Sequence, residues 1–157
     1  LERLRRLVGL LPADPPNPSG EYNPVGVLPS AYEPFIGSAE YDVRDLLQLL
    51  LDAGPLDEYK AEYGQTLVCG YGRLGGRPVG VVANQRKRVK PADGPLQFGG
   101  VLYVDSAEKA ARFVMDCNQT RVPVLFVQNV NGFMVGRDSE QGRIIKAGAK
   151  LVNAISN

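Results

Sequence analysis

The stretch PVLFVQNVNGFMVG, residues Pro123 to Gly136, joins an apolar run to a loop bounded by glycines. Val124 to Val127 is an uninterrupted series of aliphatic and aromatic side chains, which predicts a strand buried on both faces, as parallel strands of α/β proteins are. Gln128 and Asn129 end this run, and a helical pattern begins at Asp138. We therefore expect a strand, a loop and a helix, an arrangement whose free N–H groups at the helix start suit a ligand or an oxyanion.

The loop also has a simpler interpretation, a tight turn closed by an apolar plug. Its turn residues are Asn131 and Gly132, its apolar side chains are Phe133, Met134 and Val135, and it closes at Gly136. In one interpretation the loop faces a ligand, and in the other its side chains only fill space. The residue pattern leaves both open.

The composition of the chain limits its functions. Its 157 residues are 44% hydrophobic, which predicts one globular domain or a piece of a larger one. A net charge of +1 gives no general attraction to nucleic acid or membranes, and no apolar run is long enough to cross a bilayer. We therefore expect no nucleic-acid or membrane partner, and a cytoplasmic location or, in a eukaryote, the mitochondrial matrix.

The chain contains no histidine and only two cysteines, Cys69 and Cys117. The absence of histidine excludes Ser/His and Cys/His nucleophilic catalysis and the common zinc sites from this segment. The two cysteines lie far apart on apolar faces, which argues against a disulfide framework or a metal cluster. We expect no metal, and chemistry here would depend on backbone N–H groups, carboxylates, lysines or tyrosines.

The amino-terminal third predicts two helices joined by a strap. Residues 1–11 have the spacing of the end of an amphipathic helix, and residues 41–53 have that of a second helix capped by Asp42, with Asp45 at the capping-box position. Between them, Pro12 to Pro34 is rich in proline, which favours extended geometry. Its aromatic residues favour a strap that packs on a surface over a disordered linker.

The middle of the chain predicts a hairpin followed by a basic loop. Residues 66–73 and 78–84 read as two strands, and Gly80 marks a bulge or the close approach of a backbone or a ligand. The run after them carries four positive charges, on Arg86, Lys87, Arg88 and Lys90. Such a run can meet a phosphate, but a solvated loop is the commoner structure.

The last third predicts a brief strand within Leu96 to Val104 and two further helices. The first helix is capped by Asp105, with Glu108 in the reciprocal position. The second has an inward face of Ile144, Ile145, Gly148, Leu151, Val152 and Ile155. The order hairpin, helix, strand, helix favours stacked ββα units over a doubly wound nucleotide-binding sheet.

Three motifs in this order resemble the carboxyltransferase (β) subunit of biotin-dependent acyl-CoA carboxylases. They are AEYGQTLVCGYGRLGGRPVGVVANQ, DSAEKAARFVMDCNQ, and VPVLFVQNVNGFMVG followed by GRIIKAGAKLVNA. The resemblance implies an α/β fold, the ClpP/crotonase-like spiral of ββα units, with residues 41–157 as the incomplete first part of the C-terminal domain. Residues 1–40 resemble the end of the interdomain helix and a Pro-rich strap.

The resemblance implies an enzyme that transfers a carboxyl group from carboxybiotin to the α (or vinylogous) carbon of an acyl-CoA. The cofactor it implies is biotin on a carrier domain, and the substrate is acyl-CoA. The implied partners are the biotin carboxyl carrier and biotin carboxylase subunit, the N-terminal carboxyltransferase domain, and further copies of the chain in a dimer of trimers. Two other functions stay open: a non-catalytic assembly module on the crotonase scaffold, and a subunit of a biotin-dependent acyl-CoA decarboxylase.

By position, the loop Gly132, Phe133, Met134, Val135 and Gly136 matches the family's loop beside the biotin pocket. The resemblance implies that the two glycines let the backbone approach biotin, while Phe133 and Met134 keep water from carboxybiotin. Supporting polar residues are Asn129, Asn131 and Asn84. No catalytic residue is assigned in this segment, and we expect no turnover from it alone, because the family's second glycine turn would follow Asn157.

The chain also departs from the family pattern. Arg143 stands where the family has small or apolar-flanked residues, and the basic loop that starts at Arg86 is longer than expected. Met134 and Val135 favour the methylcrotonyl, geranyl or glutaconyl members over the propionyl type.

Overall fold

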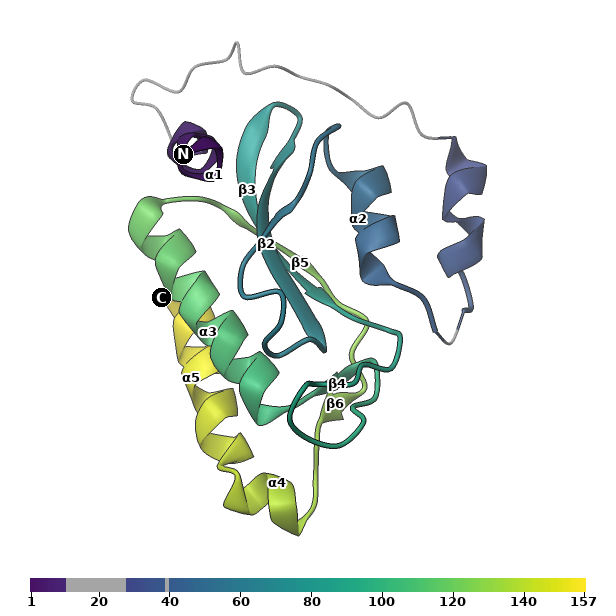
Figure 1. Ribbon diagram of the computed structural model, residues 1–157, viewed down its shortest axis with the longest axis vertical. Helices are drawn as coiled ribbons and strands as arrows, with labels where there is room; N and C mark the ends of the chain where they lie inside the picture. Colours follow the sequence, from purple (N-terminus) through teal and green to yellow (C-terminus); the bar gives the residue numbers. More distant parts are fainter. Residues whose placement is uncertain (11–27, 39) are drawn as a thin grey trace.

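A four-stranded sheet with the strand order β1-β2-β3-β5 forms the centre of the computed structural model (Figure 1), which describes residues 1–10, 28–38 and 40–157. Its strands are β1 (Asp57–Glu58), β2 (Leu67–Leu74), β3 (Arg77–Asn84) and β5 (Val124–Val127). β2 and β3 form the expected antiparallel hairpin, and β5 pairs with β3 in parallel. A second sheet has two short parallel strands, β4 (Val101–Leu102) and β6 (Gly132–Phe133).

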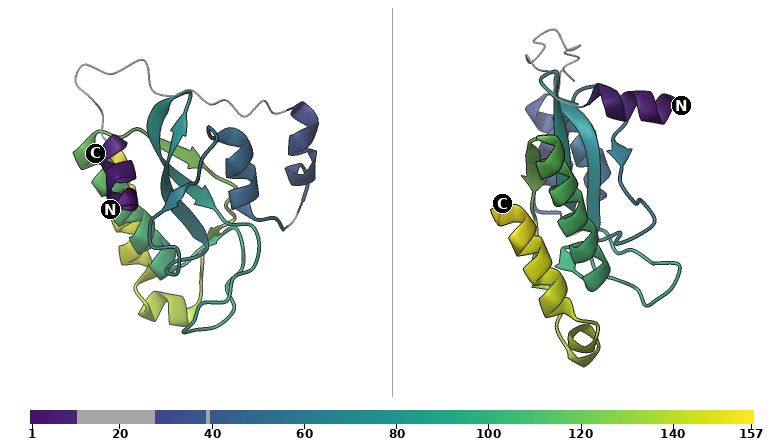
Figure 2. Two further views of the ribbon diagram at one scale, coloured as in Figure 1. Left: turned by 45° about the horizontal axis from the view of Figure 1, so that its top comes forward. Right: turned by 90° about the vertical axis from the view of Figure 1, so that its left-hand side faces the viewer.

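Helices cover both faces of the large sheet (Figures 1 and 2). On one face lies α2 (Val43–Leu50), and on the other lie α3 (Val104–Thr120) and α5 (Ile144–Ser156) side by side. Three shorter helical segments complete the described chain: α1 (Glu2–Gly9), the 3₁₀ helix η1 (Pro29–Phe35) and α4 (Arg137–Gln141).

The alternation of side chains along the hairpin divides the core into two clusters. Leu67, Cys69 and Val82 point to the side of α3, where they join Phe113 and Leu151 in what we call the α3-side cluster. The residues between them point the other way and form the α2-side cluster, with Val43, Leu47, Leu51, Val68, Val79, Val81 and Ala83. Each strand of the hairpin therefore stabilises both layers, as its apolar pattern predicts.

Gly80 is a place of close approach, as the sequence indicates. A Cβ at this position would lie 2.6 Å from the Cys117 sulfur and 3.3 Å from the Phe113 ring. The neighbours are side chains of α3, and the pairing of β3 with β2 continues through Gly80 without a bulge. The missing side chain lets α3 pack directly against β3.

β5 is less buried than its sequence predicts. All four of its residues are half-buried, because within the described residues it pairs with β3 alone and so lies at an edge of the sheet. Both faces still contact the core, since Phe126 packs on the α3-side cluster and Leu125 on the α2-side cluster. The strand therefore packs on both faces as expected, but it is half-buried instead of fully buried.

The helix caps confirm one expectation and correct another. Asp42 caps α2 as predicted, and its carboxylate accepts a hydrogen bond from the Arg44 N–H at 3.0 Å. The cap of α3 is Tyr103 instead of Asp105, and the Tyr103 N–H donates to the Ser106 hydroxyl at 2.9 Å. The predicted partner Glu108 instead pairs with Lys150 of α5 at 2.8 Å. Helix α3 starts earlier because Ser106 supplies the reciprocal bond.

The predicted last helix is divided in two. Between α4 and α5, Arg143 has a left-handed backbone with φ of 70°, and α5 starts after it. The buried face of α5 contains Ile144, Ala147, Gly148, Leu151 and Ala154. Ile145, Val152 and Ile155, which the sequence places on the inward face, are exposed. The reason is that only a narrow stripe of α5 is buried, whereas its apolar residues extend over a wider part of its surface.

At the amino terminus, α1 matches the helix expected over residues 1–11, although residue 11 lies outside the described residues. Most of the predicted strap, residues 12–27, also lies outside them. The described end of the strap forms η1 instead of an extended segment, and it packs on α2: the Tyr32 hydroxyl donates to the Leu49 carbonyl at 3.2 Å, and the Phe35 ring meets the Tyr41 ring edge-on.

Candidate functional site

The loop from Gly132 to Gly136 is held along one side by β4. β6, which contains Gly132 and Phe133, pairs with Val101 and Leu102, and the Met134 N–H donates to the Leu102 carbonyl at 2.8 Å. Gly136 then starts α4. The loop thus leaves the carboxyl end of β5 and runs beside the chain segment that leads into α3.

The other side of this loop is open. Gly132 and Gly136 have positive φ angles of 149° and 109°, and a Cβ built on either glycine would meet no other atom within 4 Å. Phe133 is 41% exposed and Val135 is 79% exposed, while Met134 is half-buried. The Phe133 ring lies 3.2 Å from where a Cβ of Gly148 would be, so it rests on α5 at a position without a side chain. The loop therefore carries exposed apolar groups and accessible backbone.

Two asparagines connect the start of the loop to other elements. The Asn129 amide nitrogen lies 3.4 Å from the Tyr41 hydroxyl, and the Asn131 N–H donates to the Gly100 carbonyl at 2.7 Å. Both contacts run outwards from the loop. They connect the loop to the start of α2 and to the end of the basic loop.

Arg86 contacts both the start of the loop and the glycines that end the basic loop. Its Nη1 donates to the Asn129 carbonyl at 3.2 Å and lies 3.5 Å from the Asn131 side-chain oxygen. The guanidinium group crosses Gly100, where any side chain would collide with Nη1, and a Cβ at Gly99 would collide with the Arg86 carbonyl. The glycine pair at 99 and 100 thus makes room for Arg86.

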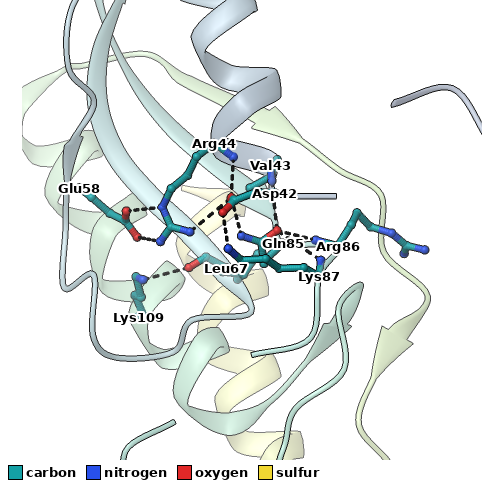
Figure 3. A network of polar contacts seen from close by, with 9 residues as sticks. All are labelled: Asp42, Val43, Arg44, Glu58, Leu67, Gln85, Arg86, Lys87 and Lys109. Atoms are coloured by element: carbon teal, nitrogen blue, oxygen red, sulfur yellow. Dashed lines mark hydrogen bonds and ion pairs between the residues drawn. The ribbon is translucent and has the colours of Figure 1, made fainter. Parts of the chain in front are cut away.

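A buried glutamine fixes the backbone beside Arg86 (Figure 3). Gln85 is fully buried, and its side-chain oxygen accepts hydrogen bonds from the Val43 N–H at 3.1 Å and the Arg86 N–H at 2.9 Å. Its side-chain nitrogen donates to the Asp42 carboxylate at 2.8 Å. Its backbone carbonyl accepts from the Gly100 N–H at 2.7 Å. One side chain therefore connects the start of α2 with the end of β3.

Asp42 lies at the centre of a charged network, which Figure 3 also shows. Burial alone would raise the pKa of its carboxyl group, but hydrogen bonds from Lys87, Gln85 and the Arg44 N–H lower the pKa well below its ordinary value. Arg44 in turn pairs with Glu58 through two hydrogen bonds, of 2.9 and 2.8 Å. Asp42 is consequently ionised at neutral pH and acts as a structural anion.

The basic loop uses its charges within the chain. Lys87 pairs with Asp42, Arg88 with Glu40 at 3.0 Å, and Lys90 donates to the Gly94 carbonyl at 2.7 Å. Because these cations have partners inside the protein, the structure favours a solvated structural loop over a phosphate site.

Asn84 is buried, whereas the other two asparagines are exposed. It is buried at the last position of β3, opposite Leu67 of β2, on the sheet face that carries Val82. Its side chain is therefore not available to a ligand at the surface.

The two cysteines belong to the α3-side cluster of the core. Cys69 and Cys117 are buried free thiols, and burial raises their pKa to about 12 and about 11.

A cavity of about 630 Å³ beside α3 and α5 is lined by charged side chains such as Lys60, Arg112 and Lys150, and by no residue of the loop. Among the described residues, no three His, Cys, Asp or Glu side chains gather as a metal site requires. In the same part of the chain, no helix has the length and apolar character needed to span a membrane.

The comparison with known proteins gives the family directly. The sequence profile of the Carboxyl transferase domain matches residues 1–157, which is the whole chain. The chain belongs to the Carboxyl transferase domain family. This confirms the resemblance that the three sequence motifs carry.

Two relatives of this carboxyl transferase chain are similar to it over most of its length. It is 43% identical over 116 residues to the biotin-dependent 3-methylcrotonyl-coenzyme A carboxylase beta1 subunit of Mycobacterium tuberculosis, a match that covers 74% of this chain and 19% of that protein. It is 38% identical over 131 residues to the mitochondrial methylcrotonoyl-CoA carboxylase beta chain of Dictyostelium discoideum, with coverages of 83% and 19%. The chain thus spans about a fifth of these relatives.

A solved structure confirms the carboxyl transferase fold. The transcarboxylase 12S hexamer with methylmalonyl-coenzyme A and methylmalonic acid bound superposes with a TM-score of 0.78 at 33% identity, over 98% of this chain and 29% of that one. The α/β, crotonase-like fold expected from the sequence is therefore correct.

The sequence did not indicate that four residues would support the loop: Arg86, Gly99, Gly100 and Gly148. The adjacent glycines after a basic run were a usable signal, because neighbouring glycines often mark a close approach of another group. Gly148 gave none, since a glycine inside a helical stripe does not reveal which side chain will rest on it.

Proposed function

We propose that this chain is part of a biotin-dependent acyl-CoA carboxyltransferase, with residues 41–157 as the first part of its C-terminal domain and residues 1–40 as the interdomain helix end and strap. The family match and the named carboxylase relatives support this proposal. They also favour a carboxylase over a decarboxylase or a non-catalytic module. The partners we propose are a biotin carboxyl carrier, a biotin carboxylase subunit, an N-terminal carboxyltransferase domain and further copies of the chain, in the cytoplasm or the mitochondrial matrix.

The single observation that carries the site is the open, glycine-bounded loop. Biotin, when bound, supplies the carboxyl group that is transferred to the acyl-CoA. The backbone at Gly132 and Gly136 is open to a ligand, because no atom beyond the neighbouring residues lies within 4 Å of a Cβ built at either position. Phe133 and Met134 provide an apolar wall, which excludes water from a group that water would otherwise decompose. Asn129 and Asn131 support the backbone on which that wall stands, and buried Asn84 supports the strand below.

The mutation Gly132→Val in the complete subunit tests this assignment. A valine at a φ of 149° cannot keep the backbone path, and its side chain would occupy the open space, so carboxyl transfer to free biotin should fall by about tenfold or more. The measurement is the rate of carboxyl transfer from the carboxylated acyl-CoA to free biotin, with the assembly checked by size-exclusion chromatography.

Gly54→Val is the matched control for this experiment. Gly54 has the same φ of 149° and also has no atom within 4 Å of a built Cβ, but it lies past the end of α2. It should keep the wild-type rate. Equal rates for Gly132→Val and wild type would reduce the loop to a packing element.

A further inference from the structure

The four residues between β5 and β6 are exposed, so few contacts fix the start of the loop. Gln128, Asn129, Val130 and Asn131 all lie at the surface. Arg86 Nη1 reaches both Asn129 and Asn131, while Tyr41 and Gly100 each reach one of them. Among the described contacts, Arg86 is therefore the side chain that touches this segment at two points.

The position of Arg86 is itself fixed from both ends. Its N–H is held by the buried Gln85 side chain at 2.9 Å, and its carbonyl lies against Gly99. Its guanidinium group lies over Gly100, a residue with a φ of 73° and no side chain to displace it. A cation held in this way makes charge-assisted hydrogen bonds, which are stronger than neutral ones and act in a fixed direction.

We propose that Arg86 is a positioning residue for carboxyl transfer, and that it acts by holding the Asn129 carbonyl and the Asn131 side chain so that Gly132 enters the open conformation of the loop. This inference rests on the proposed function of the loop. Two other cations of the basic run have different partners: Lys87 pairs with Asp42, and Arg88 pairs with Glu40.

The test uses the complete subunit with free biotin as the acceptor. Arg86→Ala should lower kcat/KM for biotin by about tenfold to a hundredfold, because the loop loses its fixed start, and should change KM for the acyl-CoA less than twofold. Arg86→Lys keeps the charge but loses the planar guanidinium group. Its kcat/KM for biotin should lie between those of wild type and Arg86→Ala. Added guanidinium chloride at millimolar concentration should restore part of the activity of Arg86→Ala.

Arg88→Ala is the matched control, since it removes an arginine of the same run whose partner is the exposed Glu40. It should keep the wild-type kcat/KM. A further readout separates positioning from general stability: if Arg86 acts through Asn131, then Asn131→Ala should cost much less in the Arg86→Ala background than in wild type.

Three results would overturn the role of Arg86. They are a kcat/KM for biotin within twofold of wild type in Arg86→Ala, equal losses for biotin and acyl-CoA, and additive effects of the two substitutions. These results are distinguishable from a failure of the proposed function, in which the unmodified complete subunit would not transfer a carboxyl group to free biotin at all.

Discussion

Phe113 and Phe126 belong to the same region of the core but differ in burial. Phe113 is fully buried on α3 and meets the Tyr59 and Tyr71 rings, while Phe126 is half-buried at the edge strand β5. A buried aromatic side chain contributes in proportion to the area it removes from water and to the cavity its loss would leave. The two residues should therefore contribute unequally to the free energy of unfolding.

Phe113→Ala should lower the free energy of unfolding by about 3 to 5 kcal/mol, and Phe126→Ala by about 1 to 2 kcal/mol. Urea denaturation followed by circular dichroism measures both values. Similar losses at the two positions would mean that β5 is enclosed more fully than the structure shows.

The contacts of single site residues were harder to predict than their identities. The loop Gly132 to Gly136 could be selected from the sequence because glycines bracket three apolar residues. Arg86 could not, since it is 43 residues from Asn129 in the chain and its run of charges gave no sign of which cation would turn inwards. A contact across such a separation depends on the sheet that brings β3 and β5 together.

At the scale of elements, the hairpin and α3 could be predicted well and α5 less so. Alternating residues determine the two faces of β2 and β3, and a cluster of apolar residues on α3 leaves one choice of inward face. α5 is apolar on more sides than one, so its sequence does not decide between Ile144 and Ile145. The burial of β5 could not be predicted either, because strand order is not a local property.

The orientation of α5 gives a test at this scale. Ile145 is 78% exposed and Leu151 is 8% exposed. Ile145→Lys should change the free energy of unfolding by less than about 0.5 kcal/mol, whereas Leu151→Lys should cost about 3 kcal/mol or more, because it buries a charge. Thermal melting of the two variants separates them. A large loss from Ile145→Lys would show that the helix is rotated.

For the molecule as a whole, the network around Asp42 joins the start of α2, the end of β3 and the basic loop. Its partners lower the pKa of Asp42 in the folded chain, so the folded state binds a proton there less readily than the unfolded state does. The resulting stabilisation is complete above about pH 4, the ordinary pKa of an aspartate, and is lost as the pH falls below it.

Asp42→Asn should therefore flatten the dependence of stability on pH. Asparagine still caps a helix, so α2 should stay folded while the titrating group is removed. Between about pH 5 and pH 2, wild type should lose more of its free energy of unfolding than the variant. Asp93→Asn, at the exposed tip of the basic loop, is the control and should follow wild type. Parallel curves for wild type and Asp42→Asn would contradict the network's role.

The excursion between Gln85 and Gly100 is closed twice, first by the hydrogen bond from the Gly100 N–H to the Gln85 carbonyl and again by the Val89–Gln97 pair, with bonds of 3.0 and 2.9 Å. Residues 92–96 beyond this double closure are exposed. Insertions or deletions there would leave both closures in register. The tip can therefore be longer or shorter without shifting the segment from Asn129 to Asn131. A longer or shorter tip would thus carry no penalty for the geometry beneath it.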